Sequence, residues 1–184
     1  MEKNGAQKGI VQYAMESGVY LGLYFVVKFV FEVFSMESFF CNTVAMAMML
    51  CVPVVIYTLM RRYRRLVGVS CYFSQLWMMG ILLFFFASLI NSLVQYIYYV
   101  YINPDYIRAQ FLAAVELLET FRPMMKDPSL LDIVKEGLDK GNVPSPMSVV
   151  VERIWVNLFF GSLLSAAMAG LAMFLPIKSK TTKR

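Results

Sequence analysis

The stretch SFFCNTVAMAMMLCVPVVIYTLM (38–60) contains no charged residue, and the basic run RRYRR (61–65) follows it directly. An α-helix needs about 20 residues without an unpaired charge to cross the roughly 30 Å of hydrocarbon in a bilayer. The stretch meets this requirement, and an arginine cluster beside it is typical of the cytoplasmic end of a membrane-spanning helix. We therefore expect a transmembrane helix over residues 38–60.

Three other segments of the chain have the same apolar character. Residues 66–104 and 154–177 contain no charge, and residues 10–36 are mostly aliphatic and aromatic with three charged residues among them. The apolar residues run nearly continuously, which is unlike the alternation of a membrane β-strand. The sequence predicts an all-α integral membrane bundle of four transmembrane helices. Their expected bounds are about 10–36, 38–60, 69–102 and 149–177.

The overall composition agrees with a membrane location. Of the 184 residues, 59% are hydrophobic and 16% are charged, whereas soluble domains average roughly 45–50% apolar and 25% charged residues. The third apolar segment is too long for a single span, because its 39 uncharged residues (66–104) would extend about 58 Å as one helix. Either the tyrosine-rich end of this stretch or its start at residues 67–73 is expected to leave the hydrocarbon.

The distribution of Lys and Arg predicts the orientation of the four spans. Basic residues gather before residue 10, at 61–65 and after residue 177, which are three segments on the same side of a four-span protein. On the opposite side, residues 103–148 contain seven acidic and five basic residues. Since cytoplasmic loops retain an excess of Lys and Arg, both termini are expected in the cytoplasm. The basic run 61–65 is interpreted as an anchor beside anionic lipid headgroups, and nucleic-acid binding is not expected.

The segment 103–148 is expected to form a helical extracytoplasmic loop. A capping side chain precedes a proline three times, a pattern typical of helix starts: Asn103-Pro104, Asp127-Pro128 and Ser145-Pro146. Apolar residues recur at helical spacing after each of the first two starts, so two amphipathic helices are predicted. Their apolar faces have three candidate neighbours, which are each other, the membrane surface and a partner protein.

Side chains that carry chemistry are scarce. The chain has no histidine, which excludes a histidine-based triad, metal site or proton relay within it, and no phosphate-binding glycine loop occurs. Cys41, Cys51 and Cys71 are predicted at three different depths of the membrane, so neither a disulfide nor a metal cluster is expected. We expect no catalytic residues, no metal and no cofactor, and the protein is not expected to be an enzyme.

Polar residues in the outer half of the predicted bundle are the candidate site. Lys28 and Glu32 are four residues apart on one helix face and are expected to pair, because ionisable groups at that depth are costly unless paired or hydrated. The next span places Ser88, Asn91, Ser92 and Gln95 on one face, and the last begins with Glu152, Arg153 and Asn157. These groups are either structural, through hydrogen bonds between helices and snorkelled charges, or they line a cavity for a small molecule or ion. The candidate ligand-binding residues are Lys28, Glu32, Asn91, Gln95, Arg153 and Asn157.

Small residues at four-residue spacing predict close contacts between helices. Gly18 and Gly22 form such a pair in the first span. The last span has two small-residue ridges. The first ridge consists of Gly161, Ser165 and Ala169. The second consists of Ser162, Ala166 and Gly170.

The order of the four spans, the basic link after the second, and the sequence Ile102-Asn103-Pro104-Asp105-Tyr106 after the third resemble an uncharacterised membrane family of Bacteroidetes, domain of unknown function 4199. The resemblance covers nearly the whole chain. It implies a helical fold in the bacterial inner membrane, and it implies no activity and no catalytic residues.

The lipid bilayer is the first expected partner of this protein. Two functional hypotheses follow. The first is a structural, accessory or interaction protein whose outer loop binds a membrane or periplasmic protein, or a second copy of the chain. The second is a small-molecule or ion transporter or channel subunit that uses the polar cluster. A lipid-modifying enzyme is a third class that no motif favours.

Overall fold

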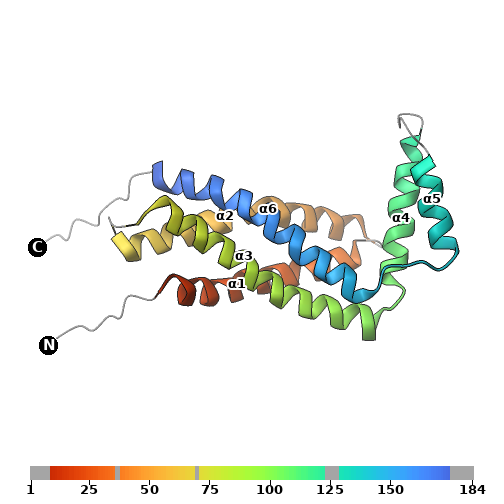
Figure 1. The fold of residues 1–184 in the computed structure, drawn as a ribbon, viewed down its shortest axis with the longest axis horizontal. Helices are drawn as coiled ribbons and strands as arrows, with labels where there is room; N and C mark the ends of the chain where they lie inside the picture. The colour runs from red at the N-terminus through yellow and green to blue at the C-terminus, as the bar shows by residue number, and fades with distance from the viewer. Residues whose placement is uncertain (1–8, 36–37, 69–70, 123–128, 175–184) are drawn as a thin grey trace, which may run out of the picture. The chain divides into compact units, whose positions relative to one another are not determined.

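Every regular element that the structure describes is a helix (Figure 1). The computed structural model describes residues 9–35, 38–68, 71–122 and 129–174, and no strand occurs among them. The helices are α1 (Ile10–Phe34), α2 (Phe39–Val67), α3 (Phe73–Ile97), the π-helical segment η2 (Tyr98–Ile102), α4 (Tyr106–Thr120), α5 (Ser129–Asp139) and α6 (Pro146–Phe174). The prediction of an all-α bundle is confirmed.

Four of these helices are long and apolar enough to cross a membrane. They are α1 with 25 residues, α2 with 29, α3 together with η2 with 30, and α6 with 29. At 1.5 Å per residue, the shortest of them extends about 38 Å, which exceeds the roughly 30 Å hydrocarbon thickness. The protein is a multi-pass membrane protein.

The observed helix ends explain the excess length of the uncharged stretch 66–104. Val67 still belongs to α2, and Gly68 ends that helix with φ +78°, a conformation that glycine adopts without strain. The next helix begins only at Phe73, so the start of the stretch leaves the helices. Its tyrosine-rich end stays helical but widens into η2, where the Asn103 N–H donates to the Tyr98 carbonyl at 2.9 Å.

The three predicted helix starts of segment 103–148 have three different outcomes. At α6 the prediction is confirmed, because Pro146 is the first helical residue and Ser145 Oγ accepts a hydrogen bond from the Ser148 N–H at 3.2 Å. At α4 the predicted cap Asn103 is wrong. The helix begins two residues later than Pro104, and Asp105 occupies the cap position without a capping hydrogen bond from its side chain. The start at Asp127-Pro128 lies outside the described residues.

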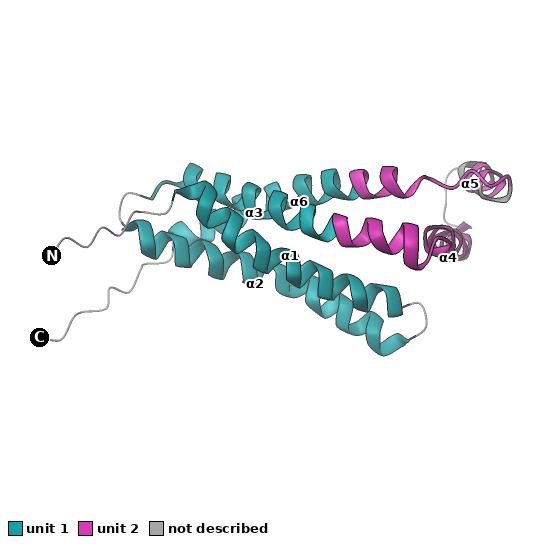
Figure 2. Cartoon of the chain, turned by 90° about the horizontal axis from the view of Figure 1, so that it is seen from below, with its two compact units in different colours: residues 1–92, 153–184 teal, residues 93–152 magenta. Residues whose placement is uncertain are grey.

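The chain divides into two compact units (Figure 2). The first comprises residues 1–92 and 153–184, and it contains α1, α2 and most of α3 and α6. The second comprises residues 93–152, which contain the end of α3, η2, α4, α5 and the start of α6.

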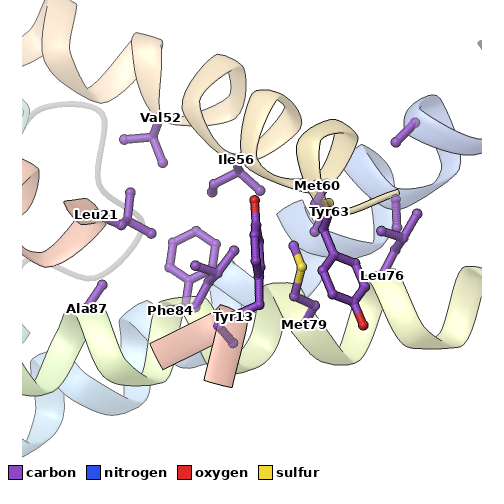
Figure 3. Close-up of a cluster of buried hydrophobic side chains, with 14 of the residues drawn as sticks. Tyr13, Leu21, Val52, Ile56, Met60, Tyr63, Leu76, Met79, Phe84 and Ala87 are labelled. Atoms are coloured by element: carbon purple, nitrogen blue, oxygen red, sulfur yellow. The ribbon is translucent and has the colours of Figure 1, made fainter. Parts of the chain in front are cut away.

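The core of the first unit is apolar and rich in aromatic side chains (Figure 3). Ile56, Met60 and Leu76 are fully buried in it. Tyr13 of α1 lies against Tyr63 of α2, with 5.0 Å between the ring centroids. The Tyr13 hydroxyl also donates to the Leu59 carbonyl at 3.2 Å. A buried phenol needs such a partner, so this bond fixes α1 on α2.

Glycine and serine allow α3 to approach its neighbours closely in the first unit. A Cβ at Gly18 would lie 2.7 Å from Phe86 Cβ, and one at Gly161 would lie 2.3 Å from the ring of Phe84. These contacts confirm the expected close packing for the Gly18–Gly22 pair and for the ridge that begins at Gly161. The other ridge of α6 differs, because a Cβ at Gly170 would meet nothing within 4 Å.

Helices α4 and α5 of the second unit pair through a small apolar contact and a set of ion pairs. Val115 and Leu131 are buried against each other. Arg122 donates to both oxygens of Asp132 at 2.8 and 2.9 Å, and Lys135 donates to Glu119 Oε1 at 2.6 Å. The two predicted amphipathic helices therefore do contact each other.

Acidification is expected to loosen the α4–α5 pair. The hydrogen bond from Lys135, together with the Arg122 charge, holds the pKa of Glu119 below its usual range. A carboxyl with a lowered folded-state pKa stabilises the fold above its unfolded pKa of about 4.3, and this contribution is lost as the pH falls through the folded value. Amide hydrogen exchange in α4 and α5, corrected for intrinsic rates, should show lower protection at about pH 3 than at about pH 6.

Glu119→Gln is the control for this effect, because its amide does not titrate. The variant should lose protection at about pH 6 and show a smaller further loss on acidification than the parent. An unchanged pH dependence in Glu119→Gln would assign the loosening to other groups.

Candidate functional site: polar residues of the bundle

Lys28 and Glu32 form an ion pair on α1, as the four-residue spacing predicts. Their side chains are 19% and 31% exposed. By helical rise, Lys28 lies about 9 Å and Glu32 about 3 Å before the end of α1 at Phe34. At that depth an unpaired charge is costly, so the pairing explains how α1 tolerates both residues.

The polar residues of α3 form a buried row, which we name the α3 stripe and define as Ser88, Asn91, Ser92 and Gln95. Their exposed fractions are 0%, 7%, 5% and 2%, respectively. Helical spacing places all four on one side of α3, and the burial confirms that this side faces protein. Within the described residues, Ser88 Oγ, Asn91 Oδ1 and Gln95 Oε1 have no hydrogen-bond partner.

Helix α6 contacts α3 and carries two of the predicted residues, Asn157 and Arg153. Gly161 lies against Phe84, and Ser165 lies against Gly80, so the two helices run antiparallel. Asn157 and Arg153 are both half-buried, and four-residue spacing puts them on the same face as Gly161.

The candidate residues therefore fall into separate sets. Five of them belong to the first unit, and Gln95 belongs to the second. Lys28 and Glu32 satisfy each other, and no hydrogen bond among the residues that the structure describes joins them to Asn91 or Asn157. Asn91 is buried on α3, and Asn157 is half-buried on α6. The structure thus brings together Lys28 and Glu32, and no polar contact that it describes joins this pair to Asn91.

The basic run 61–65 does more than the sequence analysis predicted. Arg62 and Arg65 are exposed, as expected for lipid anchors. Arg61 instead donates to the Tyr57 hydroxyl at 3.3 Å. Arg64 donates to the carbonyl of Ala172 in the last turn of α6, where helical carbonyls lack partners of their own. No signal in the sequence separates Arg64 from its neighbours, because the distinction depends on which side of α2 faces α6.

The bond from Arg64 should make this residue the most sensitive of the run. Arg64→Met is expected to lower the free energy of unfolding by about 1–2 kcal/mol, since it removes a charge-assisted hydrogen bond and a favourable interaction with the C-terminal end of α6. Arg65→Met removes the same charge from an exposed position and should change stability by less than about 0.5 kcal/mol. Thermal unfolding of the detergent-solubilised protein compares the two. Equal losses would show that charge alone matters.

The three cysteines differ in burial. Cys41, Cys51 and Cys71 are all free thiols, and Cys71 alone is buried. No cluster of three or more Cys, Asp or Glu side chains that could hold a metal ion occurs in the described part of the chain.

Comparison with known sequences identifies the family. The profile of the family described as protein of unknown function DUF4199 matches residues 16–173. The chain belongs to this family. The match includes all four spans and the α4–α5 segment of this DUF4199 protein, in agreement with the resemblance seen in its sequence. Searches of curated proteins and of solved structures gave no match.

Proposed function

We propose that this DUF4199 protein is a non-catalytic accessory protein of the bacterial inner membrane that binds another protein through its helical segment 103–148. The observation that carries the proposal is the surface of the α4–α5 pair. Ion pairs hold the two helices together, while Leu117 and Ile133 are each 62% exposed and Val134 is 45% exposed. Exposed apolar side chains rimmed by charges are typical of protein-binding surfaces.

The charge of this segment favours a protein over the lipid surface as its neighbour. Residues 103–148 contain seven acids and five bases. Anionic headgroups attract basic segments, and the segment has no such excess. A membrane or periplasmic protein is therefore the proposed partner.

The proposed orientation puts both termini in the cytoplasm and segment 103–148 outside. Two observations support this orientation: the number of candidate spans among the described residues is even, and the basic residues gather before residue 10, at 61–65 and after residue 177. Reporter fusions after Arg65 should report the cytoplasm, and a fusion after Lys140 should report the outside. A cytoplasmic reporter at Lys140 would require a different number of spans.

Site-specific photo-crosslinking in intact membranes tests the binding surface. A photoreactive residue at Ile133 should give a discrete protein adduct, whereas one at Lys140, whose side chain is 66% exposed and paired with Glu136, should not. The partner identified in this way should bind the purified parent protein and should bind Ile133→Asp at least tenfold more weakly. Adducts with lipid alone, or equal adducts at both positions, would contradict the proposal.

The α3 stripe supports a second candidate function, a transporter or channel subunit. A buried polar row within a membrane helix is costly and often marks a solute pathway. Four spans are few for a carrier, so this function would require association with a second copy or another subunit. Solute or ion flux into proteoliposomes that Asn91→Leu abolishes, with insertion intact, would favour this function over the first.

A further inference from the structure

The α3 stripe holds three acceptors that the described protein groups leave unsatisfied. They are Ser88 Oγ, Asn91 Oδ1 and Gln95 Oε1. Leaving one buried polar atom without a partner costs about 1–3 kcal/mol, and the low dielectric of a membrane interior offers no relief. A row of three such atoms on one helix face therefore indicates that another group donates hydrogen bonds to them.

The burial of the stripe limits the size of that group. Ser88 is 0% and Asn91 is 7% exposed, so the protein's own helices already cover both side chains. A lipid chain or a helix from a partner would need an exposed surface instead. The missing donor has to be small enough to fit between packed helices.

Charge further limits which chemical group can donate these hydrogen bonds. The stripe contains only neutral side chains, and a cation without a carboxylate partner is costly to bury in a low-dielectric interior. Glu32 is engaged by Lys28 and offers no compensating charge. The donor is therefore expected to be small and neutral. Water meets both conditions, because a buried water typically makes about three hydrogen bonds to polar groups that have no partner within the protein.

We propose that Ser88 and Asn91 bind internal water molecules, which donate hydrogen bonds to Ser88 Oγ and Asn91 Oδ1. Ser88 and Asn91 are three residues apart, so they lie about 4.5 Å apart along the helix. One or two waters spaced at ~2.8 Å span that distance. The site does not depend on which side of the membrane is cytoplasmic or on the role of segment 103–148.

Ser165 of α6 provides a matched dry control. It is also 0% exposed, and its hydroxyl also has no partner among the described residues. A Cβ added to Gly80 would nevertheless lie 2.4 Å from Ser165 Oγ, so the seam is closed at that point. We therefore expect Ser165 to lack a water ligand.

Nuclear magnetic resonance of the full-length protein in detergent micelles tests the proposal directly. With asparagine labelled by ¹⁵N, the side-chain amide of Asn91, assigned by its loss in Asn91→Leu, should show a nuclear Overhauser effect to water. Contacts of that amide to protein or acyl-chain protons alone, with no effect to water, would overturn the proposal.

Two serine substitutions give an independent readout. Ser88→Ala removes a water ligand and should lower the Tm of the detergent-solubilised protein, whereas Ser165→Ala removes an unsatisfied hydroxyl and should leave the Tm equal or higher. Both changes keep the side-chain volume nearly constant, so both variants should fold. A Tm of Ser88→Ala equal to or above that of the parent would overturn the proposal.

Discussion

Gly161→Leu is expected to destabilise the bundle by about 3 kcal/mol or more. A Cβ at this position would already lie 2.3 Å from Cγ of Phe84, and leucine adds three more carbon atoms beyond it. Phe84 has little freedom to move, because it is 4% exposed and lies against Phe25 with 6.2 Å between ring centroids. Overpacking of well-filled cores typically costs about 1–3 kcal/mol and sometimes more, and relief here would require α3 and α6 to separate.

Gly170→Leu is the matched control for this prediction. It makes the same replacement on the same helix, with the same gain in helix propensity, but a Cβ at Gly170 would meet no atom within 4 Å. Its stability should therefore stay within about 0.5 kcal/mol of the parent or rise slightly. Reversible unfolding in mixed micelles measures both variants. Equal losses would show that the backbone of α6, rather than its contact with Phe84, is sensitive.

Lys28→Met is expected to cost about 2 kcal/mol because it leaves Glu32 in α1 without its cation. A charged group at a helix centre costs about 2.5–3.5 kcal/mol on insertion scales and less towards the interface. The position of Lys28, about 9 Å from the end of α1, favours the lower part of that range. The same unfolding measurement should detect the loss.

The double variant Lys28→Met with Glu32→Leu tests whether the ion pair has a structural or a functional role. Because an apolar pair of similar volume often replaces a buried ion pair without loss, the double variant should recover most of the stability. Recovery of stability together with loss of a ligand or a current would make the pair functional. If both single variants match the parent in stability, the two side chains are hydrated and α1 lies at another depth.

The four long helices could be predicted from their scarcity of charged residues, but the points where several of them end could not. Helix α2 continues through the arginine run to Val67, because arginine is a good helix former and its long side chain can reach water from inside a helix. The charge pattern marks where a span leaves the hydrocarbon, which is not where its backbone stops being helical. The delayed start of α4 reflects the turn at Pro104 and Asp105.

The candidate site could be predicted one helix at a time. Four-residue spacing is enough to place Lys28 beside Glu32 and to put Asn91 on one face with Gln95. It carries no information about which faces of different helices meet. That relation depends on close contacts such as Gly161 with Phe84, so the separation of Asn157 from the α1 pair and the inward position of Arg64 emerged only from the structure.

The bond between Arg64 and Ala172 also bears on the timing of synthesis. Its partners are 108 residues apart in the chain, and at roughly 5–20 residues per second Arg64 is made about 5–20 seconds before Ala172 exists. Throughout that interval the inward-facing guanidinium lacks the carbonyl that it will bind. A chain that stalls before the last turn of α6 lacks this bond, so the link between α2 and the end of α6 can form only when synthesis of the last span is complete.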